Sequence, residues 1–124
     1  MDFSLSPQQE QIRETILKLC ESFGDAYWLA CERAAKFPIE FHKAIADGGW
    51  LGIAMPEAYG GSGLGIAEAA IMMQAVAESG AAMTGASSIH MNISGLEPVV
   101  VFGSDAQKRR MLPPLIRGED KACF

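Results

Sequence analysis

The chain has 124 residues, of which 49% are hydrophobic and 20% charged, so it can form one domain with its own core and is neither disordered nor fibrous. Its formal net charge of −5 argues against nucleic acid or an anionic membrane as the main partner. The three cysteines form no C-x-x-C pair and have no ligand spacing with either histidine, so we expect reduced thiols and no metal site.

The first part of the chain predicts three amphipathic helices. Ser6 begins a Ser-Pro-Gln-Gln capping box, and the apolar residues after it recur at helical spacing as far as Gly24. Asp25 can cap a second helix that runs to about residue 36. Pro38 opens a third helix, and a Gly-Gly pair ends it. Residues 50–55 are expected to be extended or irregular.

Residues 56–65 form a glycine-rich stretch that must be tested as a nucleotide-binding loop. Gly61 and Gly63 fit the start of a G-x-G-x-x-G pattern, but Ile66 stands where the third glycine belongs. No Lys-Ser or Lys-Thr pair follows, which excludes a P-loop. We therefore interpret this stretch as a structural connector that enters a helix, and prefer that to a phosphate cradle.

The second half of the chain predicts further helices. Residues 66–79 and 81–94 carry few charges and are expected to be largely buried. The β-branched run 99–102 is ambiguous between helix and strand. A second Ser-x-x-Gln cap starts a last helix at Ser104, and we interpret its basic side chains as a solvated face rather than an anion site: Lys108, Arg109, Arg110 and Arg117.

These elements predict an all-α bundle of about six helices joined by short loops, in residues 1–120. No alternation of strands and helices occurs, which argues against a doubly wound nucleotide-binding fold. Residues 121–124 have the pattern of a strand that has just begun. The amino terminus lacks a signal or transit pattern, and no segment is long and apolar enough to span a membrane. We expect a cytoplasmic protein, with a processed organelle protein as the alternative.

Searches for catalytic motifs find no nucleophile elbow and no H-E-x-x-H zinc motif. His42 and His90 are far apart in sequence and have no carboxylate at ligand spacing. His90 lies within a nearly uncharged helix, where burial would lower its pKa and favour the neutral imidazole. A histidine in the core or in a pocket wall is favoured over a catalytic base. The chain therefore lacks a self-sufficient active site.

Two stretches resemble the N-terminal helical domain of acyl-CoA dehydrogenases. The first is Gly49-Trp50-Leu51-Gly52-Ile53-Ala54-Met55-Pro56-Glu57-Ala58-Tyr59-Gly60-Gly61-Ser62-Gly63-Leu64-Gly65, and the second is residues 97–124, with Gly-Ser-Asp-Ala-Gln-Lys and Leu-Pro-Pro-Leu-Ile-Arg-Gly-Glu. The resemblance implies a flavoenzyme with FAD that removes the α-proton of an acyl-CoA and transfers the β-hydride to the flavin. It places the catalytic glutamate in a C-terminal domain that this chain does not contain. Residues 121–124 then become the truncated start of the central β-domain, and the chain resembles a fragment.

The resemblance also implies particular site residues. The central helix of the family lines the pocket for the acyl tail, which makes Ala86, Ser87 and His90 the candidates for substrate binding. Phe124 is the candidate aromatic contact to the flavin. Ordinary helix packing is the competing interpretation for the first three.

The family docks an electron-transferring flavoprotein on this domain and is expected to form homo-oligomers. Trp50, Leu64 and Met72 are candidates for the apolar docking patch, or equally for the core. Alternative functions are another flavoenzyme of the superfamily, such as an acyl-CoA oxidase or a monooxygenase, and a non-catalytic helical interaction module. Separated from its other domains, the chain is expected to be inactive and to expose apolar side chains: Met72, Met73, Met83 and Val99 to Phe102.

Overall fold

The computed structural model describes residues 4–122 and shows seven α-helices joined by short helical turns. The first half contains α1 (Pro7–Cys20), α2 (Asp25–Ala34), α3 (Ile39–Asp47) and two single 3₁₀ turns, η1 (Trp50–Gly52) and η2 (Glu57–Tyr59). The second half contains α4 (Ile66–Val76), the π-helical turn η3 (Ala77–Ala81), α5 (Ala82–Ser94), α6 (Glu97–Phe102) and α7 (Asp105–Ile116). The expected all-α bundle is confirmed, and the described residues form no strand.

Both predicted capping boxes are present. The backbone N–H of Gln9 donates to the Ser6 hydroxyl at 3.2 Å, and the Gln9 side chain accepts from the Ser6 N–H at 2.9 Å. Ser104 and Gln107 repeat the exchange at the start of α7, at 3.3 and 2.8 Å. These reciprocal bonds satisfy two N–H groups that a helix start otherwise leaves unpaired.

One expectation about local structure is wrong, and one ambiguous segment is now assigned. Asp25 is not the cap of α2: Gly24 occupies that position without a side-chain bond, and Asp25 is the first helical residue. A carboxylate there still interacts favourably with the positive end of the helix dipole.

The ambiguous run 99–102 is helical and forms most of α6. The helix satisfies its backbone locally, for example by the bond from the Val100 N–H to the Leu96 carbonyl at 3.0 Å.

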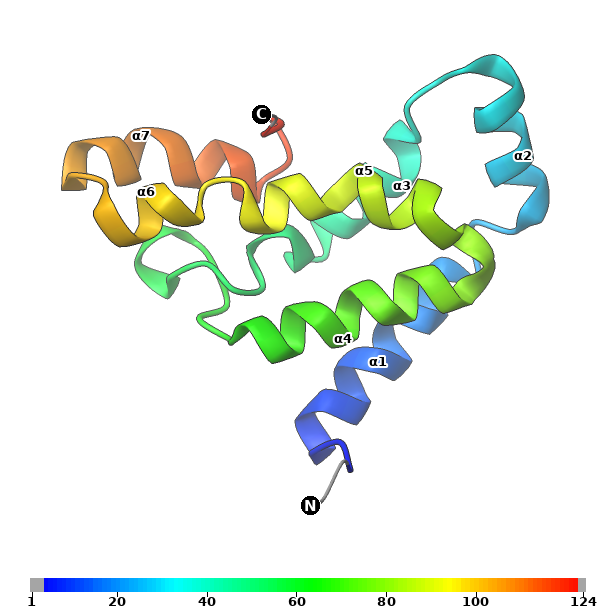
Figure 1. Ribbon diagram of the computed structural model, residues 1–124, viewed down its shortest axis with the longest axis horizontal. Helices are drawn as coiled ribbons and strands as arrows, with labels where there is room; N and C mark the ends of the chain where they lie inside the picture. Colours follow the sequence, from blue (N-terminus) through cyan, green and yellow to red (C-terminus); the bar gives the residue numbers. More distant parts are fainter. Residues whose placement is uncertain (1–3, 123–124) are drawn as a thin grey trace.

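Two clusters of buried side chains hold the bundle together. The larger one joins α1, α3, α4 and α5 and is filled by Ile16, Phe41, Ile45, Met72 and Ile89, among others. The smaller one packs Met55, which precedes the glycine-rich loop, against the inner face of α7: Leu112, Leu115 and Ile116. Figure 1 shows how α4 runs beside α1 and then turns back into α5 through η3.

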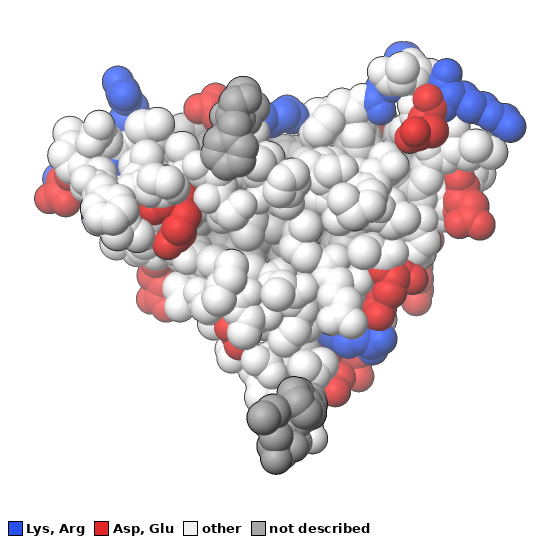
Figure 2. Space-filling model, in the orientation of Figure 1, with Lys and Arg blue, Asp and Glu red and all other residues white. Residues whose placement is uncertain are grey.

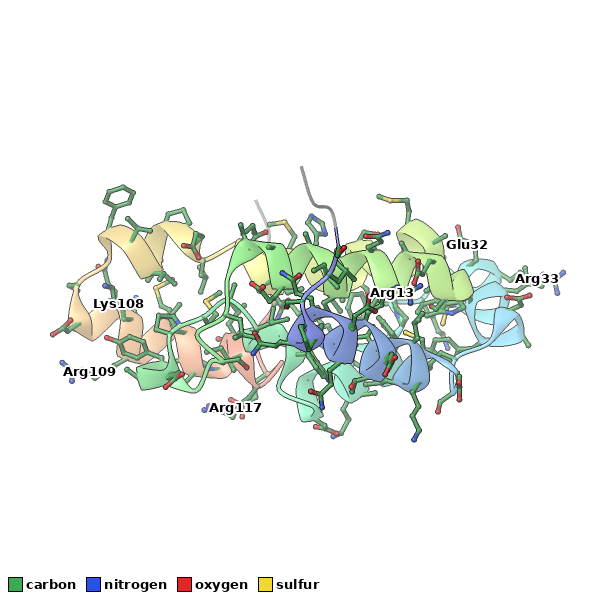
Figure 3. The ribbon with its side chains drawn as sticks, turned by 90° about the horizontal axis from the view of Figure 1, so that it is seen from below. Arg13, Glu32, Arg33, Lys108, Arg109 and Arg117 are labelled. Atoms are coloured by element: carbon green, nitrogen blue, oxygen red, sulfur yellow. The ribbon has the colours of Figure 1, made fainter. Side chains whose placement is uncertain are left out.

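Three consecutive helices share one face of the molecule. In Figure 3, α4, α5 and α6 lie along the upper edge, whereas the labelled Arg117 lies on the opposite side. Because α4 and α5 are joined by a tight turn, their outward surfaces are neighbours, and they define the face considered below as the site. Within residues 4–122, none of the helices has the length and apolar character needed to cross a bilayer.

Candidate functional site

The glycine-rich loop is a connector whose amide groups are already used. The N–H groups of Ser62, Gly63 and Leu64 donate to the carbonyls of Gly52, Met55 and Ile53 at 2.9, 2.8 and 3.0 Å. A Cβ atom on Gly61 would lie 2.1 Å from the Met55 oxygen, so the close approach of the two chain segments requires glycine there. A phosphate cradle needs free N–H groups that converge on the anion. The connector interpretation is therefore confirmed.

The three predicted acyl-contact residues lie on α5 and differ in exposure. Ser87 and His90 lie on its exposed side, and Nδ1 of His90 is 3.1 Å from the Ser87 carbonyl oxygen. Ala86 is 7% exposed and belongs to the core edge of the helix. The structure thus brings Ser87 and His90 together on the surface and places Ala86 beneath it. Of the two expected positions for His90, the core is wrong because its side chain is exposed, whereas the wall of a pocket agrees with the groove described next.

A groove between α4 and α5 opens on the same side as His90. One part has a volume of about 150 Å³ and is lined by apolar side chains of both helices, with His90 and Ser94 as its polar members: Ile66, Ala69, Ala70, Met73, His90, Ile93 and Ser94. An adjoining part of about 360 Å³ extends towards the glycine-rich loop and shares Ile66, Ile93 and Ser94 with the first. The groove can hold an apolar chain against helix surfaces rather than a charged group.

No Asp, Glu, Lys or Arg lines the part of the groove beside His90, whereas Glu97 lines the adjoining part. Helix α5 contains no Asp, Glu, Lys or Arg, and Figure 2 shows the centre of the face without charged side chains, which gather at its rim. The carboxylates near α4 are engaged on the side of α1: Glu68 accepts from the Gln9 amide at 2.9 Å, and Glu78 pairs with Arg13 at 2.6 Å. The bond from Gln9 lowers the pKa of Glu68 below its usual range. These two carboxylates of α4 and η3 are therefore held by α1 and do not line the groove.

A second hollow lies between α1, Trp50 and the second half of the glycine-rich loop. It has a volume of about 390 Å³, and its lining includes Ile12, Thr15, Trp50, Ser62 and Leu64. Trp50 and Leu64 are half-buried at this hollow and pack against the larger core cluster. Met72 is 0% exposed and belongs to the core, so its assignment to a docking or exposed apolar surface is wrong.

The remaining exposed apolar side chains lie largely as expected. Met83 is 75% exposed and Phe102 86% exposed, and Val101 is also exposed. Met73, Val99 and Val100 are half-buried. The basic side chains of α7 and its end are largely solvated, as expected, since Arg109 and Arg117 pair with the nearby carboxylates of Asp105 and Glu119 on the surface. Phe124, the candidate flavin contact, lies outside the described residues.

One unusual titratable group was not identified from the sequence. His42 on α3 is 1% exposed, and its Nε2 atom has no hydrogen-bond partner in the described part of the chain. Burial lowers the pKa of His42 below its ordinary value, and the Lys121 cation adds to this effect. The apolar spacing of α3, with Phe41 and Ile45 inward, gives only a weak signal for the burial of their neighbour. Residues 4–122 contain no group of three His, Cys, Asp or Glu side chains that could hold a metal ion.

Comparison with known proteins agrees with the helical architecture. The family model described as "Acyl-CoA dehydrogenase, N-terminal domain" matches residues 6–119. Mitochondrial isovaleryl-CoA dehydrogenase from Pongo abelii is 34% identical over 117 residues, which cover 93% of this chain and 27% of that protein. Acryloyl-CoA reductase (NADH) from Anaerotignum propionicum is 32% identical over 125 residues, 100% of this chain and 31% of that protein. Benzylmalonyl-CoA dehydrogenase from Aromatoleum aromaticum is 27% identical over 119 residues, which cover 96% of this chain and 31% of that protein.

The chain spans roughly a third or less of the length of these relatives (27–31%). Their names carry three different acyl groups, and one of them is a reductase. The comparisons therefore leave the acyl group of this chain open.

Proposed function

Because the chain belongs to the acyl-CoA dehydrogenase family and corresponds to its N-terminal domain, we propose that it is the N-terminal part of an FAD-dependent enzyme that dehydrogenates an acyl-CoA thioester between its α and β carbons. The observation that carries this proposal is the apolar part of the groove between α4 and α5, beside His90. In the proposed enzyme, Ala86, Ser87 and His90 border the acyl tail, and of the three His90 lines the groove itself.

The role of the chain in this reaction is to bind and enclose the tail. Apolar side chains such as Ile66, Met73 and Ile93 remove an acyl chain from water, at about 25 cal/mol per Å² of apolar surface buried. Residues 4–122 do not fit FAD by themselves, because the amides of the glycine-rich loop are already bonded within the chain. Cofactor binding and proton abstraction are accordingly assigned to other parts of a longer protein, and the isolated chain is proposed to be inactive.

The first test is to read the open reading frame downstream of Phe124. The proposal predicts a Thr-Glu-Pro-like segment followed by two further domains. A stop codon directly after Phe124 would contradict it and would favour a helical interaction module instead. A downstream region whose flavin site lets molecular oxygen reach the flavin would favour an acyl-CoA oxidase or a monooxygenase.

A second test changes the groove in the full-length protein. Ser87→Leu should lower kcat/KM for the longest accepted acyl chain by about tenfold or more and spare shorter ones, since one misplaced methylene in an apolar pocket costs ~1–3 kcal/mol. Ala86→Leu should act in the same direction, but it also overpacks a buried position. Ala26→Leu, on the exposed surface of α2, serves as the control. An unchanged chain-length profile in Ser87→Leu would show that Ser87 does not border the tail, and an unchanged profile in Ser94→Leu, at a position that lines both parts of the groove, would show that the groove does not hold it.

We further propose that the hollow between α1, Trp50 and Leu64 receives an apolar side chain of an electron-transferring flavoprotein. Its support is the combination of a half-buried tryptophan with an open volume next to polar groups of α1, a typical surface for a protein partner. Thr15→Trp would fill the hollow from its exposed edge. It should raise KM for the partner protein at least tenfold and leave the reduction of an artificial small dye unchanged. Equal loss with both acceptors would refute the docking role.

The location and assembly of the protein belong to the same proposal. We propose a cytoplasmic homo-oligomer, and the exposed Val101 and Phe102 on α6 support self-association. Fractionation of cells and sedimentation of the purified protein test these two points separately.

A further inference from the structure

A buried histidine meets the segment that follows α7, residues 117–122. The His42 imidazole packs edge-on against Phe37, with ring centroids 5.4 Å apart. Gly118 forms the turn above it with φ 71°, and a Cβ atom at Gly118 would lie only 3.2 Å from Cε1 of His42. The imidazole is thus covered by the backbone of this segment, and its Nε2 atom is left without a partner.

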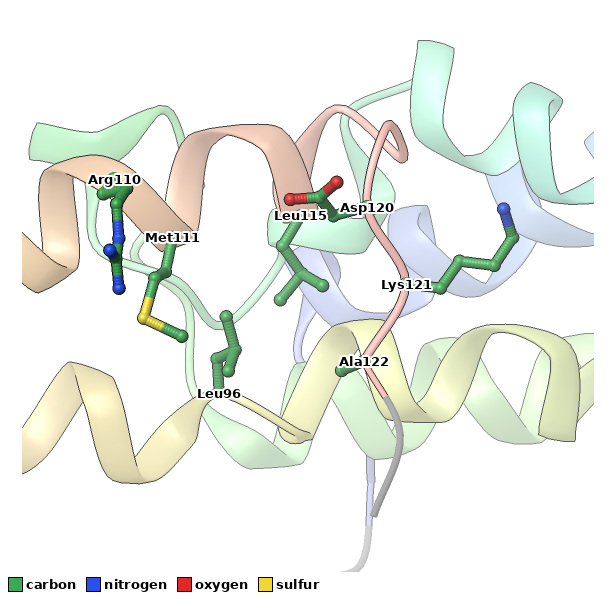
Figure 4. Close-up of a pocket in the computed structure, with 7 residues that line it drawn as sticks. All are labelled: Leu96, Arg110, Met111, Leu115, Asp120, Lys121 and Ala122. Carbon is green, nitrogen blue, oxygen red and sulfur yellow. The ribbon is translucent and has the colours of Figure 1, made fainter.

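Two other side chains hold the same segment in place. The Asn92 amide, 2% exposed on α5, donates to the carbonyls of Leu115 at 3.2 Å and Asp120 at 2.9 Å. The Lys121 ammonium lies 5.2 Å from the centroid of the Phe37 ring, within the range of a cation–π contact. Figure 4 shows the Lys121 side chain pointing away from Leu96 and Met111, along the side of the segment opposite to those residues.

The charges around His42 offer no counter-ion for an imidazolium. Lys121, on the covering segment, is the charged group whose field reaches the ring, and it disfavours a second positive charge. The Asn92 side chain acts in the opposite direction and favours protonation, but it carries no charge. Helix α5, which packs behind the ring, has no acidic or basic residue apart from the exposed His90. Of the other charged side chains on α3 and the covering segment, Lys43 pairs with Asp47 and Arg117 with Glu119, and Glu40 accepts from the Tyr27 hydroxyl. Asp120 also lies on the covering segment, but it is not among the groups that shift the pKa of His42.

We propose that His42 and Asn92 form a proton-sensitive latch, in which the neutral imidazole lets residues 117–122 dock on α3 and α5 and its protonation releases them. Burial of an unpartnered neutral nitrogen carries a modest desolvation cost. An unpaired buried charge costs far more, and opening the segment restores it to water. The latch does not depend on the proposed function.

The direction of the pH effect follows from the environment of the ring. Since burial and Lys121 lower the pKa of His42, the docked state binds fewer protons than the open state at mildly acidic pH. Docking is therefore fully favoured above the ordinary histidine pKa of about 6.5 and is lost as the pH falls below it.

Hydrogen exchange measured by mass spectrometry tests the latch on the 124-residue chain at low concentration. The reporters are the amides of Gly118, Glu119 and Asp120, which donate to the carbonyls of Leu115 and Pro114 at 3.1, 3.0 and 3.2 Å. Protection is followed from pH 8 to 5 and normalised to an unfolded reference at each pH. We expect these amides to lose at least tenfold in protection below pH ~6.5, while α1 stays protected.

Three variants test whether His42 causes the loss of protection at acidic pH. His90→Gln should keep it, because His90 is exposed, whereas His42→Gln should stay docked and show no pH dependence. Lys121→Met should reduce the loss of protection at acidic pH, since a smaller lowering of the His42 pKa leaves a smaller difference in proton binding between the docked and open states. A transition that persists in His42→Gln, that disappears in His90→Gln, or that is absent from the wild-type chain would overturn the latch. A segment unprotected at every pH in His42→Gln would also overturn it. Should that variant fail to fold, an unchanged loss of protection in Lys121→Met is the contradicting result.

Discussion

At the scale of single residues, two histidines in the same chain have opposite environments. His90 is exposed on α5 next to Ser87, whereas His42 is buried beneath the Gly118 turn. Sequence periodicity identified His90 as the residue of interest, because its helix is nearly uncharged. The burial of His42 depends on a turn 76 positions later in the chain (118 − 42), and no local pattern reports such a contact.

The buried His42 predicts an acid-sensitive stability. Its folded-state pKa is lowered, so the unfolded chain binds more protons at mildly acidic pH and the free energy of unfolding falls as the pH drops below about 6.5. Urea denaturation of the wild-type chain and of His42→Gln at pH 7.5 and 5.5 measures this effect. The wild-type chain should lose more stability between the two pH values. Equal losses in both proteins would contradict the assignment to His42.

The caps show what local sequence can predict. Ser104→Ala should lower the free energy of unfolding by about 1 kcal/mol, because it removes the acceptor of the Gln107 N–H at the start of α7. Ser22→Ala, at an exposed position outside any helix, is the matched control and should change little. Urea denaturation compares the two, and a Ser104→Ala loss no larger than that of the control would contradict the capping role.

At the scale of elements, the joint between α4 and α5 is strained. Gly80 has φ 101° and Ala82 has φ 47° with ψ −140°, a conformation that residues other than glycine rarely adopt. These backbone angles arise at the π-helical turn, because the chain reverses direction there within five residues. The reversal places α5 beside α4, and both helices then line the groove. The sequence predicted the end of the helix at Gly80. It gave no indication of the strain at Ala82, because alanine is a strong helix former.

Replacing Ala82 by glycine should stabilise the chain. Relief of the unusual backbone angles is worth about 1–3 kcal/mol, and the added freedom of glycine in the unfolded chain costs about 0.5–1 kcal/mol, so the free energy of unfolding should rise by about 1 kcal/mol. Ala30→Gly, in the exposed middle of α2, should instead lower it by about 1 kcal/mol. Destabilisation by both substitutions to a similar degree would refute the strain.

At the scale of the whole molecule, the helical architecture followed from the sequence, whereas the composition of its surfaces did not. Capping boxes and apolar spacing act within a few residues, so α1 and α7 could be placed in advance. Whether an apolar residue faces the core depends on contacts between distant helices. Met72 was expected at a surface and lies in the core, while Met83 on the next helix is exposed. The groove likewise arises from two helices and has no signature in either of them alone.

The exposed residues of α6 predict self-association. Val101 and Phe102 present apolar surface that water solvates poorly, so the chain should form dimers or larger species at micromolar concentration. The double substitution of Val101 and Phe102 by serine should reduce the associated fraction, whereas Ala106→Ser, at another exposed position, should not. Sedimentation velocity measures the distribution. A wild-type chain that remains monomeric throughout would contradict this expectation.

The central claim is that the groove between α4 and α5 borders the acyl tail, and photochemical labelling tests it most directly. An acyl-CoA with a diazirine at the end of its tail would be irradiated with the full-length protein, with and without excess unlabelled acyl-CoA, and the labelled peptides sequenced. Competable labelling is predicted within Ile66–Val76 and Ala82–Ser94, at groove residues such as Met73 and His90. Competable labelling of the full-length protein that spares both helices would contradict the account.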